Sequence, residues 1–177
     1  MENRLYLHVP SFEELDYRKE ILSQPDTMSY NRGYEIGFTN YDNETGCIDF
    51  RNEIWSDWYS KWISNEPERF YAYITDIKSN NYIGEVSFRY DNSSNSHCIG
   101  IVIEAKYRGK GFCSEGLVKL AEKAFEGLGV DKLRNDIPIG RKSAILGHKK
   151  AGFKEIGIVD GKCILELSKE EYFNFEK

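Results

Sequence analysis

The stretch IVIEAKYRGKGFCSEGLVKLAEKAF, residues 101–125, decides the fold. An apolar, β-branched run gives way to two glycines, Gly109 and Gly111, that stand among cationic residues, and Ser114 then opens a helical pattern. Apolar residues recur after Ser114 at the spacing of one helix face: Leu117, Leu120, Ala121, Ala124, Phe125 and Leu128. The stretch therefore predicts a strand, a glycine turn and a helix.

The glycine turn indicates an anion site. Backbone N–H groups at a helix N-terminus have no intrahelical partner and carry partial positive charge. Glycine lets a ligand approach this backbone, and Lys106, Arg108 and Lys110 add positive charge. The pattern GxxxxGK[ST] is absent from the sequence, and Ser114 stands where GxGxxG requires its third glycine. A phosphate cradle of another kind is indicated, the alternative being a tight strand-to-helix turn with no ligand.

The rest of the chain supplies short elements on both sides of this stretch. We expect strands at 4–9, 70–77, 82–90, 97–104 and 131–139, helices at 11–24, 55–63 and 142–151, and a final pair of strands joined at Asp160-Gly161. Only the part around 97–139 has the form of a parallel crossover. These elements predict an α/β (α+β) fold with a mixed, mostly antiparallel sheet of about seven strands flanked by helices. We expect one domain over residues 1–177.

Composition excludes several function classes. The net charge of −5 argues against a nucleic-acid-binding protein. No apolar run reaches the roughly 20 residues of a membrane span, and the start MENRLYLHVP lacks the apolar core of a signal peptide. The four cysteines show no CxxC spacing and the three histidines form no cluster. We expect a cytoplasmic protein with reduced cysteines, without a metal and without a membrane or nucleic-acid partner.

Two segments together resemble a known family. VIEAKYRGKGFCSEGL (102–117) followed by KSAILGHKKAGF (142–153) is similar to the GNAT superfamily of acetyl-CoA-dependent N-acetyltransferases. The similarity is greatest to the branch that includes ribosomal-protein N-terminal acetyltransferases and some aminoglycoside acetyltransferases. The family signature Q/R-x-x-G-x-G/A reads here as Arg108-Gly109-Lys110-Gly111-Phe112-Cys113, with cysteine in the last place. The order of elements matches the family over nearly the whole chain.

The resemblance implies where acetyl-CoA binds. Its pyrophosphate would meet the backbone N–H groups of Gly109 to Ser114, and its pantetheine arm would pair like a strand with Ile101, Val102 and Ile103. Such pairing needs an open sheet edge. Pro138 cannot donate a ladder hydrogen bond, so we expect the two central strands to splay apart near Pro138 and to leave a groove for the cofactor.

Direct acetyl transfer requires that the amine lose its proton, and three carboxylates are candidates for the base. Asp136 matches an acidic residue that serves as base in some family members, and Glu85 and Glu104 are the alternatives. A water relay without a dedicated base stays open. Cys113 at a helix start could be a nucleophile, but the cradle explains its small side chain.

Two residues depart from the family pattern. His148 stands where a tyrosine often protonates the leaving thiolate; it is either the acid in its place or a surface histidine. Arg141 stands where the family often has asparagine, and it would contact a phosphate or carbonyl of the cofactor or face water.

The acceptor side is indicated by residues 28–49. This segment carries aromatic residues, Tyr30, Tyr34, Phe38 and Tyr41, and carboxylates, Glu35, Asp42, Glu44 and Asp49. Such a set suits a cationic amine, although a loop that packs its aromatics under an acidic surface has the same composition. We therefore expect acetyl transfer to a primary amine of a small molecule or peptide by direct attack. The alternative is a catalytically inactive CoA-binding sensor or interaction domain, and monomer and homodimer both stay open.

Overall fold

The computed structural model describes residues 3–37 and 40–175. The strands are β1 (Leu5–His8), β2 (Arg69–Asp76), β3 (Tyr82–Asp91), β4 (Ser96–Ile103), β5 (Lys132–Pro138), β6 (Lys154–Val159) and β7 (Lys162–Ser168). The α-helices are α1 (Leu15–Leu22), α2 (Pro25–Met28), α3 (Trp55–Trp62), α4 (Phe112–Glu122), α5 (Lys142–Lys150) and α6 (Lys169–Phe175). A π-helical turn, Lys123–Gly127, follows α4.

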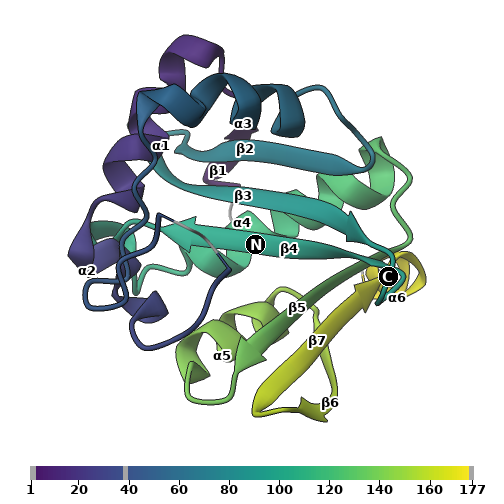
Figure 1. Ribbon diagram of the computed structural model, residues 1–177. Helices are drawn as coiled ribbons and strands as arrows, with labels where there is room; N and C mark the ends of the chain where they lie inside the picture. The colour runs from purple at the N-terminus through teal and green to yellow at the C-terminus, as the bar shows by residue number, and fades with distance from the viewer. Residues whose placement is uncertain (1–2, 38–39, 176–177) are drawn as a thin grey trace.

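The strands form one seven-stranded sheet in the order β1-β2-β3-β4-β5-β7-β6. Neighbours are antiparallel except β4 and β5, which run parallel. This parallel pair is short, because its register comprises only His97 with Leu133 and Cys98 with Arg134. Figure 1 shows β4 and β5 diverging beyond this point. The expected fold, a mixed and mostly antiparallel sheet with a splayed strand pair, is confirmed.

Pro138 is not the cause of the divergence, contrary to our expectation. Pairing between β4 and β5 ends at Arg134, well before Pro138 is reached. Pro138 lies opposite Lys162 at the end of the ladder between β5 and β7. The next residue, Ile139, donates its N–H to the Gly161 carbonyl at 3.0 Å, so the nitrogen of Pro138 faces away from β7, on the side from which β4 has already diverged.

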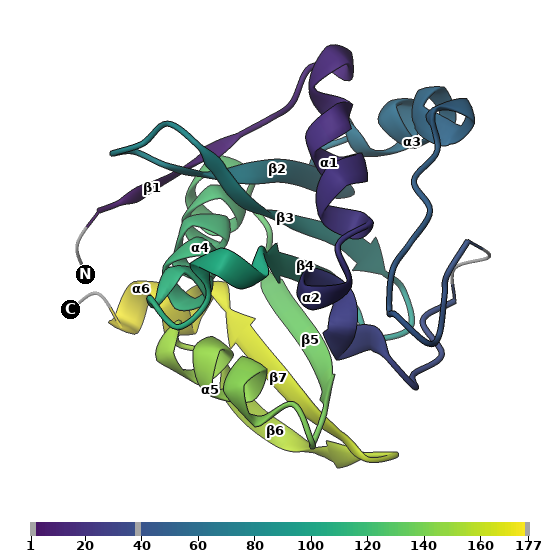
Figure 2. The ribbon, with the colours of Figure 1, turned by 90° about the vertical axis from the view of Figure 1, so that its left-hand side faces the viewer.

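The two faces of the sheet carry separate apolar cores. Figure 2 shows α4, α5 and α6 on one face and α1, α2 and α3 on the other. On the first face, Ile99 and Ile103 of β4 pack in the same cluster as Leu117 of α4. On the second face, Val102 packs with Leu15 of α1. Consecutive residues of β4 thus face opposite cores, as the alternation of a strand requires.

Local signals account for several boundaries. The predicted capping box is present, because the N–H of Ser11 donates to the Glu14 carboxylate at 2.8 Å just before α1. Asp160 and Gly161 both have positive φ, +47° and +73°, and join β6 to β7 in the predicted hairpin. Helix α4 begins at Phe112, two residues before the Ser114 start that we expected. Gly111 caps it with a φ of +83°, so the glycine itself forms the turn.

Candidate active site

The open edge of β4 presents alternate backbone groups. The N–H of Glu104 donates to the carbonyl of Ile83 at 3.0 Å, in the same register as the rest of the β3–β4 ladder. Because backbone groups alternate along an antiparallel strand, Ile101 and Ile103 direct their N–H and C=O toward the divergent β5 side. Val102 directs its own backbone toward β3. Of the three predicted edge residues, Ile101 and Ile103 can therefore pair with a ligand through the backbone and Val102 cannot.

The glycine turn that follows is shaped for close approach to the backbone. Gly109 and Gly111 have φ values of +77° and +83°, a region that side chains disfavour. No described atom lies within 4 Å of a Cβ placed on Gly109. Helix α4 starts directly after the turn, so the N–H groups of Phe112, Cys113 and Ser114 have no intrahelical acceptor. Open space, positive φ and unpaired amides together fit a phosphate.

Arg4 fastens the turn to the first strand. Its backbone N–H and its Nε donate to the Glu115 carboxylate at 2.7 and 2.9 Å, and its Nη2 donates to the Lys110 carbonyl at 3.2 Å. The guanidinium also lies 4.6 Å from the centre of the Phe112 ring. Glu115 is 3% exposed, so its contacts with Arg4 hold the first turn of α4 against the residue that precedes β1.

The cations of the glycine motif have different roles. The Arg108 side chain donates to three backbone carbonyls: Nε to Ile103 at 3.0 Å, Nη1 to Asp26 at 3.2 Å, and Nη2 to Thr27. Lys106 forms an ion pair with Glu104 at 3.0 Å. Lys110 lies over the Tyr107 ring and has no acidic partner among the described residues. Lys110 is therefore the cation of this motif that is free to meet a phosphate.

Cys113 packs inward and is not an activated nucleophile. A Cβ placed on Gly147 of α5 would lie 3.3 Å from its Sγ, so the thiol fills the contact between α4 and α5. Burial raises the pKa of Cys113 to about 11, which outweighs the helix N-terminus that we considered as an activating influence.

His148 is a core residue, which corrects the alternative of a surface histidine and leaves the acid role a prediction. It is 1% exposed, its Nδ1 lies 2.8 Å from the Ala144 carbonyl, and its Nε2 lies 3.0 Å from Asn135 Nδ2. The neutral tautomer with a proton on Nδ1 satisfies both contacts. Burial lowers the pKa of His148, so the imidazolium that the acid role needs is disfavoured. The ring packs edge-on against Phe153 instead.

Arg141 fills the space between two of the predicted aromatic residues. Its guanidinium carbon lies 5.0 Å from the Tyr30 ring centre and 4.5 Å from the Tyr34 ring centre. Its buried Nε has no hydrogen-bond partner in the described structure. Burial and the charge of Glu85 raise the pKa of Tyr30 to about 12, although Arg141 opposes them. Two of the four aromatic residues expected to bind an amine, Tyr30 and Tyr34, are thus already in contact with the protein's own arginine.

Two of the four carboxylates of the 28–49 segment already accept hydrogen bonds from the protein. Asp42 accepts from the N–H of Glu44 at 2.9 Å and holds its own turn, and Asp49 accepts from Arg51 Nε at 2.9 Å. Tyr41 donates to the Asn31 carbonyl. Glu35 and Glu44 are exposed. Phe38 lies outside the described residues.

A second arginine, largely covered by aromatic rings, contacts Glu85. Arg18 of α1 forms an ion pair with the Glu85 carboxylate and also donates to Tyr71 Oη at 3.2 Å. Its guanidinium carbon lies 4.6 Å from the centre of the Trp58 ring and 5.0 Å from that of Phe50. Tyr71 donates its own O–H to Glu85. Both Glu85 oxygens therefore already accept from fixed donors, which leaves this carboxylate less available to an amine than we expected.

The other two candidates for the base, Glu104 and Asp136, differ in solvent exposure. Glu104 is 1% exposed and accepts from Tyr17 Oη at 2.9 Å and Gln24 Nε2 at 3.3 Å, besides pairing with Lys106. Asp136 is paired with Arg134 at 2.7 Å, but 40% of its side chain is exposed. Its neighbour Asn135 contacts His148 under α5, so Asp136 faces the opposite side of the sheet, the side of α1–α3.

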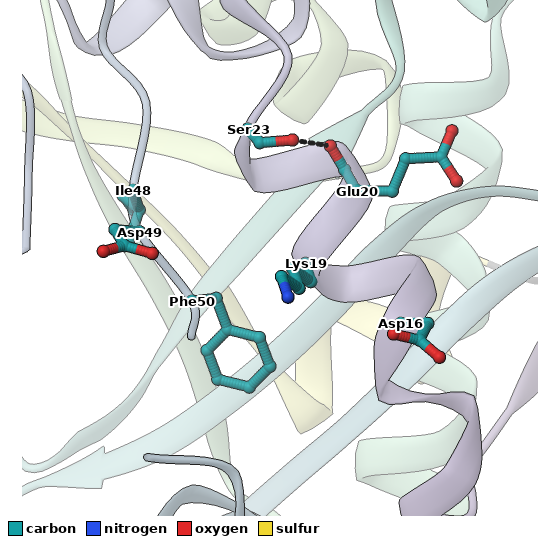
Figure 3. Close-up of a pocket in the computed structure, with 7 residues that line it drawn as sticks. All are labelled: Asp16, Lys19, Glu20, Ser23, Ile48, Asp49 and Phe50. Carbon is teal, nitrogen blue, oxygen red and sulfur yellow. Dashed lines mark hydrogen bonds between the residues drawn. The ribbon is translucent and has the colours of Figure 1, made fainter. Parts of the chain in front are cut away.

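A hollow on the outer side of α1 is separate from this site. It measures about 350 Å³ and is lined by Asp16, Lys19, Glu20, Ser23, Ile48, Asp49 and Phe50 (Figure 3). Lys19, one of these residues, donates to Asn52 at 2.8 Å. Phe50 is 3% exposed and stands between this hollow and Arg18. The hollow does not reach the β4 edge.

Two further classes of feature are not found in the described part of the chain. Residues 3–37 and 40–175 contain no helix that is long and apolar enough to cross a membrane. The same ranges contain no group of three or more His, Cys, Asp or Glu side chains placed to hold a metal ion.

Comparison with known proteins identifies the family. The profile of the family described as "Acetyltransferase (GNAT) domain" matches residues 4–154. No protein of the curated set matches the chain. Spermidine N-acetyltransferase from Vibrio cholerae, in complex with CoA and spermine, has a TM-score of 0.72 and 18% identity, covering 98% of this chain and 100% of that one. An acetyltransferase (GNAT family) from Bacillus anthracis has a TM-score of 0.70 and 16% identity, covering 96% and 98%. At these identities the solved structures show a shared fold.

Proposed function

The chain belongs to the GNAT family of acetyl-CoA-dependent acyltransferases, and on that premise we propose that it acetylates a primary amine of a small molecule or peptide by direct attack. One observation carries the proposal: the open β4 edge leads directly into the glycine turn at the start of α4. A ligand with amides next to a diphosphate fits that continuous strip of backbone donors. We take the domain to extend over residues 1–177.

The chain's own backbone holds the cofactor in this proposal. Ile101 and Ile103 offer the edge groups, and the amides from Gly109 to Ser114 form the cradle, with Lys110 as the nearby cation. Bound acetyl-CoA supplies an activated thioester carbonyl. Phe112 and Cys113 contribute their N–H groups, while their side chains pack against Arg4 and α5.

Asp136 is the base that we propose for the amine proton. It faces the acceptor side of the sheet beyond the point where β4 and β5 separate, and it is the most accessible of the three candidates. Arg134 Nε donates to one of its oxygens at 2.7 Å and fixes the orientation of the carboxylate. Glu85 instead positions Arg18 and Tyr71 under α1.

The acceptor is proposed to be cationic in solution. Glu35 and Glu44 are exposed on the segment that covers this side, and the chain carries a net charge of −5, so a positively charged amine is attracted. A related fold, the V. cholerae spermidine N-acetyltransferase, has been solved with CoA and spermine. A screen of amines would identify the acceptor of this chain.

Release of free thiol from acetyl-CoA tests the proposal when it is followed against a panel of mono-, di- and polyamines, aminoglycosides and peptides. We expect turnover with at least one amine, and a loss of about 10²-fold or more in kcat/KM for Asp136→Asn. Asp131→Asn, in the turn before β5, is the control for loss of a carboxylate.

The competing function is a CoA-binding domain without catalysis, which the buried state of His148 favours. Acetyl-CoA that raises the melting temperature while every amine fails to release thiol would establish that alternative.

A further inference from the structure

We propose that Arg108, the first residue of the glycine motif, is a positioning residue that clamps the acceptor-side helices onto the cofactor strand and does not bind phosphate. The inference rests on the proposed function for its two substrates. It deepens that function by coupling the amine site to the acetyl-CoA site.

The donors of Arg108 are directed at backbone carbonyls. Nη1 and Nη2 meet the carbonyls of Asp26 and Thr27 in α2, and Nε meets the carbonyl of Ile103 at the end of β4. A guanidinium fork can serve several acceptors at once because its N–H groups are fixed in one plane. The Arg108 guanidinium is thus directed toward α2, and its three nitrogens already donate to carbonyls.

A second set of hydrogen bonds joins α2 to the residues after β4 through Thr27, which is fully buried. Its hydroxyl oxygen accepts from the N–H of Ala105 at 3.1 Å and donates to Gln24 Oε1 at 2.6 Å. Gln24 in turn donates to Glu104 at 3.3 Å, and Tyr17 of α1 donates to the same carboxylate at 2.9 Å. Helices α1 and α2 are thus joined to the β4–α4 connection at several points.

The contact with Ile103 has a consequence for the cofactor. Ile103 presents its carbonyl on the open edge of β4, and Arg108 Nε already occupies that carbonyl. The Ile103 carbonyl keeps one lone pair for a ligand, so strand-like pairing would use the Ile101 backbone, the Ile103 N–H and at most that second lone pair. Arg108 therefore lies at the end of the open β4 edge, where it also contacts α2.

The test compares Arg108→Lys with Lys110→Met. Arg108→Lys keeps the charge and loses the planar fork, whereas Lys110→Met removes a charge from the same loop. We expect Arg108→Lys to raise the KM for the amine by about tenfold or more, since small displacements of positioning groups have large kinetic effects. Its Kd for acetyl-CoA, measured by calorimetry without an amine, should change by less than about threefold and keep its salt dependence.

Lys110→Met should show the opposite split, with weaker and less salt-dependent binding of acetyl-CoA and an unchanged KM for the amine. Hydrogen exchange without either substrate gives a readout that does not need activity. Amides of residues 26–31 should exchange faster in Arg108→Lys than in the parent, and at the parent rate in Lys110→Met.

Thr27→Val provides a second route if Arg108→Lys does not fold. It preserves side-chain shape, removes the second set of hydrogen bonds and leaves Arg108 in place, so it should reproduce both the higher KM for the amine and the faster exchange. The proposal is overturned if Arg108→Lys behaves as Lys110→Met does, or if Arg108→Lys and Thr27→Val both leave exchange in residues 26–31 unchanged. Failure of the proposed function would appear differently, as a parent protein that acetylates no amine.

Discussion

The sequences of the glycine turn at 108–114 and of the aromatic segment at 28–49 both suggested ligand binding. In the structure the groups of the turn are free, whereas part of the aromatic segment is already in contact with the protein. The turn offers backbone N–H groups that stay free, because Gly109 and Gly111 have no side chains to cover them. The aromatic segment offers ring faces, and Arg141 already lies between Tyr30 and Tyr34. A site made from backbone is built by local sequence, whereas a site made from side chains can be filled by any distant residue that reaches it.

The largest effect that we expect on ligand binding comes from Gly111→Asp, which changes the backbone site directly. The substitution puts a carboxylate on a residue with a φ of +83° at the start of α4, against the position of a phosphate. Acetyl-CoA should then no longer raise the melting temperature, whereas at 100 times Kd it should stabilise the parent by about 2.7 kcal/mol.

Gly129→Asp is the matched control for Gly111→Asp. Gly129 has a φ of +68° and open space around its Cβ position, but it lies after α4 and away from the cradle. It should keep the full thermal shift, and an equal loss in both variants would mean that backbone strain rather than the site is responsible.

The next effect concerns the aromatic side, where Arg18 is held by Glu85, Phe50, Trp58 and Tyr71. Arg18→Met leaves the buried Glu85 without its cation, so we expect a loss of about 3–5 kcal/mol in the free energy of unfolding, measured by urea titration. Arg18→Met/Glu85→Gln should recover part of the loss. No recovery in the double variant would show that Arg18 contributes mainly through its ring contacts.

A smaller effect tests whether Arg141 fills an aromatic cage. Arg141→Ala should lower the free energy of unfolding by about 1–2 kcal/mol, because two cation–π contacts are lost. Millimolar methylguanidinium should then raise the melting temperature of Arg141→Ala and leave that of the parent unchanged. Equal responses of the two proteins would contradict a cage that is closed by Arg141.

The smallest effect concerns His148, whose burial lowers its pKa. The unfolded chain binds a proton at this residue near pH 6.5 and the folded chain does not, so the free energy of unfolding falls as the pH decreases below about 6.5. His148→Gln should remove that part of the pH dependence, seen as the difference between parent and variant in urea titrations from pH 5 to 8.

The kinetic side of the same variant separates a core residue from an acid. Gln can still accept the hydrogen bond from Asn135, and kcat should change by less than about threefold. A loss of 10²-fold or more, the range of a general acid, would restore the catalytic role that the resemblance implied.

The sequence predicted what depends on neighbours along the chain. Strand alternation, the capping box at Ser11 and Glu14, the Asp160-Gly161 hairpin and the glycine turn all appear at or close to the expected positions. Each is a property of a few consecutive residues, so local patterns are enough to find it.

The side-chain contacts could not be predicted in the same way. Arg108 lies 81 residues from Thr27 and Arg18 lies 67 residues from Glu85, and no local pattern links such partners. For the same reason His148 could be aligned with a catalytic position although Asn135, its partner in space, gives it a structural role. Arg4, Arg18 and Tyr71 were missed altogether, because an arginine or tyrosine that pairs across the fold has the same sequence context as one on the surface.

The short register between β4 and β5 also bears on how the molecule opens. Among the described residues, only His97–Leu133 and Cys98–Arg134 pair between the two parts of the sheet. The contact between β1–β4 and β5–β7 is therefore mainly apolar packing beneath α4. Apolar packing is not directional, and two blocks held in this way can unfold with separate free energies. A ligand that pairs along the β4 edge would reinforce the weaker junction. Native-state hydrogen exchange should then show two cooperative units in the free protein and a single one when acetyl-CoA is bound.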